Sequence, residues 1–202
     1  AIYSGKANRL WEDSYKNSYD QVIANINNHT QVDMPKMLLI NKYYWHLSLL
    51  TLLLSDGDDN KAFVKEVLSI DSVNTIDIVV NKSKYKHYKQ NSVLELAKAI
   101  EHRTSYTLDE LRGILIPRWT TSEIYTYLYL LFTPKSTKII EDITVKFNNN
   151  LTIDSLSEGE KKLLLLKSAF EFAIQEDSLF LLDEPDAHIH INNKERIIKL
   201  IE

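Results

Sequence analysis

The sequence LSEGEK, at residues 156–161, has the pattern of a helix start that is open to a ligand. Ser157 is a favourable N-cap residue and Glu160 follows three positions later, so the pair predicts a capping box. At such a start, unpaired backbone N–H groups and the positive end of the helix dipole can hold an anion such as phosphate. Gly159 leaves the first turn without a side chain at the point where a ligand would approach closely.

A second stretch, SLFLLDEP at residues 178–185, is an apolar run that ends in two carboxylates and a proline. This pattern is typical of a buried parallel strand that opens at its carboxyl end. There Asp183 can hold Mg²⁺ through water, and Glu184 can orient or deprotonate an attacking water. Taken singly, the first stretch also fits a plain helix cap, and the second fits a strand that meets solvent.

In this order, the two stretches resemble the nucleotide-binding domains of ABC-type ATPases, with a signature motif followed by a Walker B strand and its catalytic glutamate. The acidic residues inside the signature and the sequence DAHIH at residues 186–190 make the resemblance more specific. They are similar to the soluble branch that contains RecF-like, SMC-like and OLD-type ATPases, including those of bacterial phage-defence systems. The motif resemblance covers about residues 143–202.

The resemblance implies an ATP hydrolase with ATP and Mg²⁺ as cofactors, in which two domains meet head to tail and enclose the nucleotide. Ser157, Gly159 and Glu160 would form the signature that one domain offers to the γ-phosphate bound by the other. Asp183 would serve Mg²⁺ and Glu184 would be the catalytic base.

The resemblance also places a segment that couples the two sites, the D-loop, at Asp186, His188 and His190. The two histidines share a face of an extended segment, which fits interface hydrogen bonds better than a metal site. The partners expected are a second copy of the domain, and DNA or a nuclease effector, in antiphage defence or DNA repair.

The expected fold class is α/β, a partial ABC-type P-loop NTPase fold with an inserted, mainly helical subdomain. Residues 1–55 are assigned to a strand end and a buried helix of the ATPase core. Residues 56–136 are assigned to the insertion, and residues 137–202 to the signature and Walker B half.

The absence of a phosphate-binding P-loop is the largest departure of these residues from the family pattern. Ser4-Gly5-Lys6-Ala7 lacks both the earlier glycine and the following Ser or Thr that the P-loop requires. The histidine that ABC-type enzymes carry on a later strand is also absent from these residues. We therefore expect turnover only as part of a longer chain. The alternative is a non-catalytic interaction module of the same fold that has lost ATP turnover.

Composition narrows the class of protein further. The 202 residues contain 24 Lys and Arg, 28 Asp and Glu, and no Cys, which excludes disulfides and thiolate metal sites. This usage fits a reducing cytoplasm. The most apolar run, Leu47–Leu54, is too short to span a bilayer, so no membrane partner is expected.

Apolar periodicity, caps and turn residues predict the remaining elements. The predicted helices are a short one within residues 8–33 and then Met34–Ser55, Lys61–Ser69, Val93–His102, Thr107–Ile116, Ser122–Phe132, Ser157–Gln175 and Asn192–Glu202. The predicted strands are the end of one at residues 1–4, then Val73–Val80, residues 139–147 before an Asn turn, and the Walker B strand. Alternating tyrosines also allow a strand at Ser122–Phe132, but the preceding residues favour a helix.

Three further features each allow two interpretations. Lys82, Lys84, Lys86 and Lys89 alternate with aromatic residues, which suits nucleic-acid contacts, although a solvated connection between strand and helix is favoured. Trp11, Tyr15 and Tyr19 share a helix face and are interpreted as packing inward rather than stacking on bases. His46 is interpreted as a packed core residue rather than a metal ligand.

Overall fold

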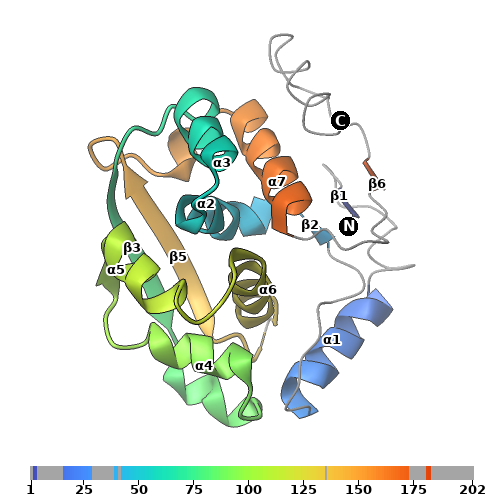
Figure 1. The fold of residues 1–202 in the computed structure, drawn as a ribbon. Helices are drawn as coiled ribbons and strands as arrows, with labels where there is room; N and C mark the ends of the chain where they lie inside the picture. The colour runs from blue at the N-terminus through green and yellow to red at the C-terminus, as the bar shows by residue number, and fades with distance from the viewer. Residues whose placement is uncertain are drawn as a thin grey trace.

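The computed structural model of the chain describes residues 2–3, 16–28, 39–40, 42–134, 136–172 and 181–182 (Figure 1). Its helices are α1 (Lys16–Asn28), α2 (Trp45–Leu54), α3 (Asp58–Ala62), α4 (Ser92–Ala99), α5 (Leu108–Leu115), α6 (Thr121–Phe132) and α7 (Glu158–Phe172). Its strands are β1 (Ile2–Tyr3), β2 (Leu39–Ile40), β3 (Val73–Val80), β4 (Ser105–Tyr106), β5 (Ile140–Phe147) and β6 (Leu181–Leu182). Short 3₁₀ or π turns are η2 (Lys42–Tyr44), η3 (Phe63–Val67), η4 (Lys82–His87) and η5 (Ile153–Ser155).

A three-stranded antiparallel sheet, in the order β4-β3-β5, forms one side of the structure. Along the paired strands, Ile76 lies opposite Val145 and Ile78 opposite Ile143, and all four side chains are buried. Residues of β3 alternate between buried and more exposed positions, which is the period expected when one face of a strand meets a core. The two long strands confirm the predictions for residues 73–80 and 139–147.

Three mutually contacting helices, α2, α6 and α7, make the core of the structure, and α2 and α6 also contact β5 (Figure 1). Helix α2 is buried along nearly its whole length, which agrees with its apolar sequence on every side. Aromatic side chains join the helices: Tyr44 stacks on Tyr129 with ring centroids 4.8 Å apart, and the rings of Tyr125 and Phe172 lie 5.8 Å apart.

A second sheet is parallel and has the order β2-β1-β6. It confirms the predicted strand end at residues 1–4, but it contradicts the helix predicted over Met34–Ser55. Leu39–Ile40 form β2, and the helix starts only at Trp45. The reason is that a sequence apolar on all sides shows no period that separates a strand from a helix.

The shorter helices follow the predictions with shifted ends. Helix α3 starts at Asp58, earlier than predicted, because acidic residues favour the first turn of a helix. Helix α4 ends at Ala99 rather than His102, since Tyr106 in the unpredicted strand β4 donates its hydroxyl to the Ile100 carbonyl at 2.7 Å. Helix α1 starts at Lys16, so of the three aromatic residues predicted on it only Tyr19 is included; Trp11 and Tyr15 lie outside the described residues.

Helix α6 confirms the helical alternative for Ser122–Phe132. Its start is a capping box, in which the Glu123 N–H donates to the Thr120 hydroxyl and the Glu123 carboxylate accepts from the Thr120 N–H. The predicted helix at Thr107–Ile116 starts in the same way, with Thr107 and Glu110. Because a capping box is a local signal, it outweighs the alternation of tyrosines in α6.

The predicted Asn turn is also present. Asn148, Asn149 and Asn150 all have positive φ, a region that Asn tolerates better than most residues. The Asn148 side chain accepts from the N–H groups of Asp71 and Ser72, at 2.9 and 3.1 Å, and so ties the end of β5 to the start of β3. The predicted division of the chain at residues 56 and 136 stays a prediction; β3 and β5, from either side of 136, pair in one sheet.

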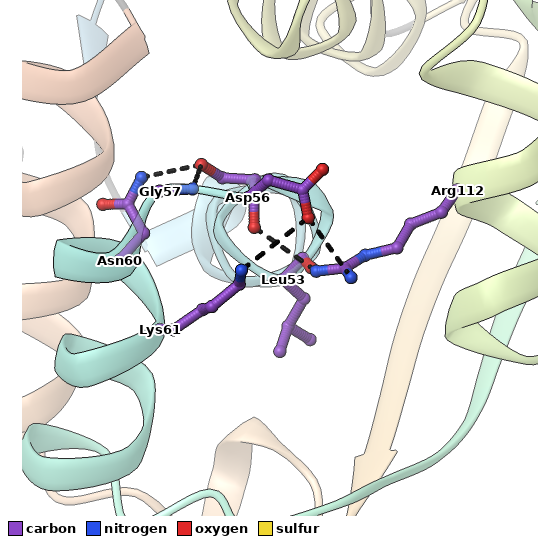
Figure 2. Close-up of polar contacts among 7 residues, drawn as sticks. Leu53, Asp56, Gly57, Asn60, Lys61 and Arg112 are labelled. Carbon is purple, nitrogen blue, oxygen red and sulfur yellow. Dashed lines mark hydrogen bonds and ion pairs between the residues drawn. The ribbon is translucent and has the colours of Figure 1, made fainter.

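Arg112 of α5 closes the carboxyl end of α2 (Figure 2). Its Nη2 donates to the carbonyl oxygens of Leu53 at 2.7 Å and Ser55 at 3.3 Å, and its Nη1 lies 3.4 Å from the Asp56 carboxylate. The last carbonyls of a helix lack intrahelical donors and carry partial negative charge, so a guanidinium satisfies both needs. Asp56 also faces Lys61 of α3, at 4.0 Å.

Replacing Arg112 with methionine is expected to lower the free energy of unfolding by about 2 kcal/mol, because half-buried carbonyls lose a charged donor while the apolar stem is kept. Arg103→Met is the control, since Arg103 forms a solvent-screened, exposed pair with Glu110 and its loss should cost clearly less than the loss of Arg112. Urea unfolding followed by circular dichroism measures both. Equal losses would contradict the role of Arg112 at the end of α2.

Candidate functional site at the start of helix α7

The predicted capping box forms at the start of α7. The Ser157 N–H donates to Glu160 Oε2 at 2.7 Å, and the Glu160 N–H donates to Ser157 Oγ at 3.3 Å. The Lys161 N–H donates to the Ser157 carbonyl at 3.0 Å, which closes the first helical turn. The preceding turn η5 and buried Leu156 bring the chain to this point in an extended conformation.

The residues of the first turn differ in exposure. Ser157 and Glu158 are exposed, whereas Gly159 lies on the buried side of the turn. Since first-turn N–H groups have no intrahelical acceptor, those of Glu158 and Gly159 depend on other partners. Ser157 therefore presents its hydroxyl at an exposed helix N-terminus.

A buried lysine, Lys161, lies in the first turns of this helix. The Lys161 side chain is only 9% exposed, and its Nζ lies 3.2 Å from Glu158 Oε1 and 4.7 Å from the centroid of the Trp45 ring on α2. The ammonium group thus contacts both a carboxylate and an aromatic face. The predictions from sequence missed Lys161 and Trp45. The sequence does contain a signal that Lys161 is buried, because it lies four residues before Leu165 and so shares a helix face with apolar residues of α7.

His46, next to Trp45, is a largely buried histidine. Burial lowers its pKa and the charge of Lys161 lowers it further, whereas Asp142 and Asp154 raise it. Its Nδ1 is buried and has no hydrogen-bond partner among the described residues. A neutral, packed imidazole agrees with the interpretation of His46 as a core residue.

The strand predicted to carry Walker B is parallel in its described part, residues 181–182. Leu181 pairs with Ile2 and Leu182 with Tyr3, so the strand adjoins the N-terminal strand of the chain in one sheet (Figure 1). Asp183 and Glu184 come directly after it in the sequence. These two, with Asp186, His188 and His190, lie outside the described residues, and their predicted roles stay predictions.

The basic stretch forms the 3₁₀ turn η4. Lys82 lies 3.6 Å from the Glu101 carboxylate, and Tyr85 donates its hydroxyl to the same carboxylate. This hydrogen bond and the charge of Lys82 lower the pKa of Glu101. Lys86 and Lys89 are exposed and Lys84 is half-buried, so the stretch keeps positive charge at the surface beyond the Lys82 pair.

Two general properties concern the described residues alone. No group of three or more His, Cys, Asp or Glu side chains lies close enough there to hold a metal ion. A search of the same residues finds no helix with the length and apolar character that crossing a membrane requires.

The sequence was compared with known proteins and families. No curated protein and no solved structure matches the chain. Residues 18–202 match the family described as "AAA domain, putative AbiEii toxin, Type IV TA system". This match covers most of the chain, and the family indicates a nucleotide-binding domain of the ATPase type. The chain therefore belongs to this family of AAA domains.

Proposed function

We propose that this chain supplies the signature and Walker B parts of an ABC-type ATPase domain that dimerises on ATP and hydrolyses it. Ser157, Gly159 and Glu160 would form the signature presented to the nucleotide of a second copy. Asp183 would hold Mg²⁺, which supplies charge neutralisation when bound, and Glu184 would take a proton from the attacking water.

The observation that carries the proposal is the exposed capping box at the start of a long helix. A phosphate at this point would meet the Ser157 hydroxyl and first-turn N–H groups without an intrahelical acceptor. The acidic residues of the motif do not oppose this, because the Glu160 carboxylate accepts from the Ser157 N–H and that of Glu158 pairs with Lys161. The residues present thus fit a nucleotide phosphate.

The process driven by this ATPase is proposed to be linked to DNA, with DNA or a nuclease effector as partner. The family description names a toxin of a type IV toxin–antitoxin system, which favours a defence context over DNA repair. Lys82, Lys84, Lys86 and Lys89 are the proposed nucleic-acid contacts. Lys82 is partly neutralised by Glu101, so the other three should contribute more of the attraction.

The second candidate function is a non-catalytic interaction module of the same fold. It is favoured by the absence of a P-loop pattern from these residues, and it is opposed by the carboxylate pair Asp183-Glu184 after β6. The two functions differ in one measurable respect. A module without turnover would not release phosphate in the full-length protein, whatever its partner.

The signature assignment is tested by Ser157→Ala in the full-length protein, with Thr120→Ala as matched control. Both variants remove the hydroxyl of a capping box, so each should lower the free energy of unfolding by about 1 kcal/mol. Only Ser157→Ala should also weaken ATP-dependent dimerisation and raise the KM for ATP, roughly tenfold, because a charge-assisted hydrogen bond to phosphate is lost. Phosphate release and sedimentation with and without ATP are the measurements. Equal kinetic behaviour of the two variants would reject the signature role.

A further inference from the structure

Lys161 is a charged residue on the buried face of α7. The residues on the same face of the helix are Leu164, Leu165, Ser168 and Phe172, and all four are buried. Every other residue of this set is apolar or, for Ser168, bonded to backbone carbonyls of its own helix. Lys161 alone among them brings a full charge to this face.

Stability does not explain a lysine at this position. Taking an ammonium group out of water is costly, and its carboxylate partner, the Glu158 side chain, is 70% exposed and so gives a screened, weak pair. A methionine of similar length would pack against the Trp45 ring without that cost. Lys161 lies one turn from Ser157 and directly after Glu160, so its charge is close enough to act on the proposed signature.

The contacts of Lys161 define the role. Glu158 is the residue after Ser157, so it belongs to the first turn that the proposed phosphate would approach. A carboxylate and a phosphate close together repel each other, and the Lys161 ammonium, 3.2 Å from the Glu158 carboxylate, offsets part of that repulsion. Trp45 holds the ammonium from the other side, and Trp45 starts the helix that follows β2, a strand of the sheet that contains β6.

We propose that Lys161 is a positioning residue of the signature: it neutralises Glu158 and holds the first turn of α7 against Trp45, so that the turn accepts a nucleotide phosphate. This inference rests on the proposed function. It concerns an acidic signature in particular, because the phosphate repulsion arises from Glu158.

The test uses the full-length protein and the variants Lys161→Met, Lys161→Arg, Glu158→Gln and the double variant Glu158→Gln/Lys161→Met. Lys161→Met should raise the KM for ATP roughly three- to tenfold with little change in kcat, since it leaves the Glu158 charge uncompensated. Lys161→Arg keeps the charge and the contact with the Trp45 ring, so its KM should stay near that of the wild type. The double variant removes both charges and should return the KM to within about twofold of the wild type.

The control is Lys167→Met on the same helix. Lys167 is also largely buried and lies 3.1 Å from Glu171, so it matches Lys161 in burial and pairing but stands away from the signature. Thermal unfolding should change similarly in both methionine variants, and the KM should rise in Lys161→Met alone.

The possible outcomes distinguish a failure of the proposed function from a failure of the inference about Lys161. A wild-type protein that neither hydrolyses ATP nor dimerises on it would overturn the proposed function and this inference with it. A wild-type protein that does both, with equal KM in Lys161→Met and Lys167→Met or with no recovery in the double variant, would overturn the inference alone. If Lys161→Met does not fold, Glu158→Gln still tests the inference. Removing the exposed carboxylate should lower the KM for ATP or leave it unchanged. A rise in the KM would contradict the proposal.

Discussion

Glu184→Gln in the full-length protein is expected to lower kcat for ATP hydrolysis by about two orders of magnitude or more, and to leave ATP binding intact. The amide has the size of the carboxylate but does not accept a proton, so general-base catalysis is lost. Since ATP is proposed to hold the dimer together, ATP that is not hydrolysed should keep it closed, and the ATP-bound dimer should accumulate. Phosphate release and sedimentation in ATP measure the two effects.

The control for this change is Glu171→Gln, which replaces a glutamate on α7 that pairs with Lys167. It should leave both kcat and the dimer fraction as in the wild type. Unchanged turnover in Glu184→Gln would reject the base assignment. A wild-type protein that binds ATP and releases no phosphate would instead support the non-catalytic module.

Tyr125→Ala is expected to lower the free energy of unfolding by about 3–5 kcal/mol, the largest stability effect predicted for this chain. Tyr125 is 1% exposed, lies on α6 and packs on Phe172 of α7. Truncation leaves a cavity between two of the three core helices, and a close-packed interior does not collapse fully into it. Denaturant unfolding of the protein measures the loss.

Tyr125→Phe separates the ring from its hydroxyl. The hydroxyl lies near that of Ser48, but neither oxygen has a hydrogen-bond partner among the described residues. Burial raises the pKa of Tyr125, so the group stays neutral across the ordinary pH range. Phenylalanine should therefore change the free energy of unfolding by less than about 1 kcal/mol. A loss as large as that of alanine would show that the hydroxyl, and not the ring, stabilises the core.

The candidate site could be predicted from sequence in the part that depends on neighbours along the chain. The capping box of Ser157 and Glu160 is such a part, because a side chain three residues away decides whether the first turn is closed. The roles of Asp183 and Glu184 were inferred from a resemblance, and the family match supports the nucleotide-binding class to which those roles belong.

Lys161 shows what such local reasoning misses. Its spacing along α7 marks it as buried, but its partner Trp45 lies more than a hundred residues earlier. The sequence around Lys161 does not indicate a contact with Trp45, and the sequence around Trp45 does not indicate one with Lys161. The same holds for Arg112, whose acceptors at the end of α2 belong to a different part of the chain.

The sequence by itself determined the helix starts at Thr107 and Ser157, the alternation of β3, and the apolar character of α2, because each follows from contacts within a few residues or from a simple period. Only the tertiary structure decided that Leu39–Ile40 is a strand, since pairing with β1 supplies hydrogen bonds that an apolar sequence does not specify. It also decided the surroundings of Lys161, because burial against α2 brings Lys161 and Trp45 together.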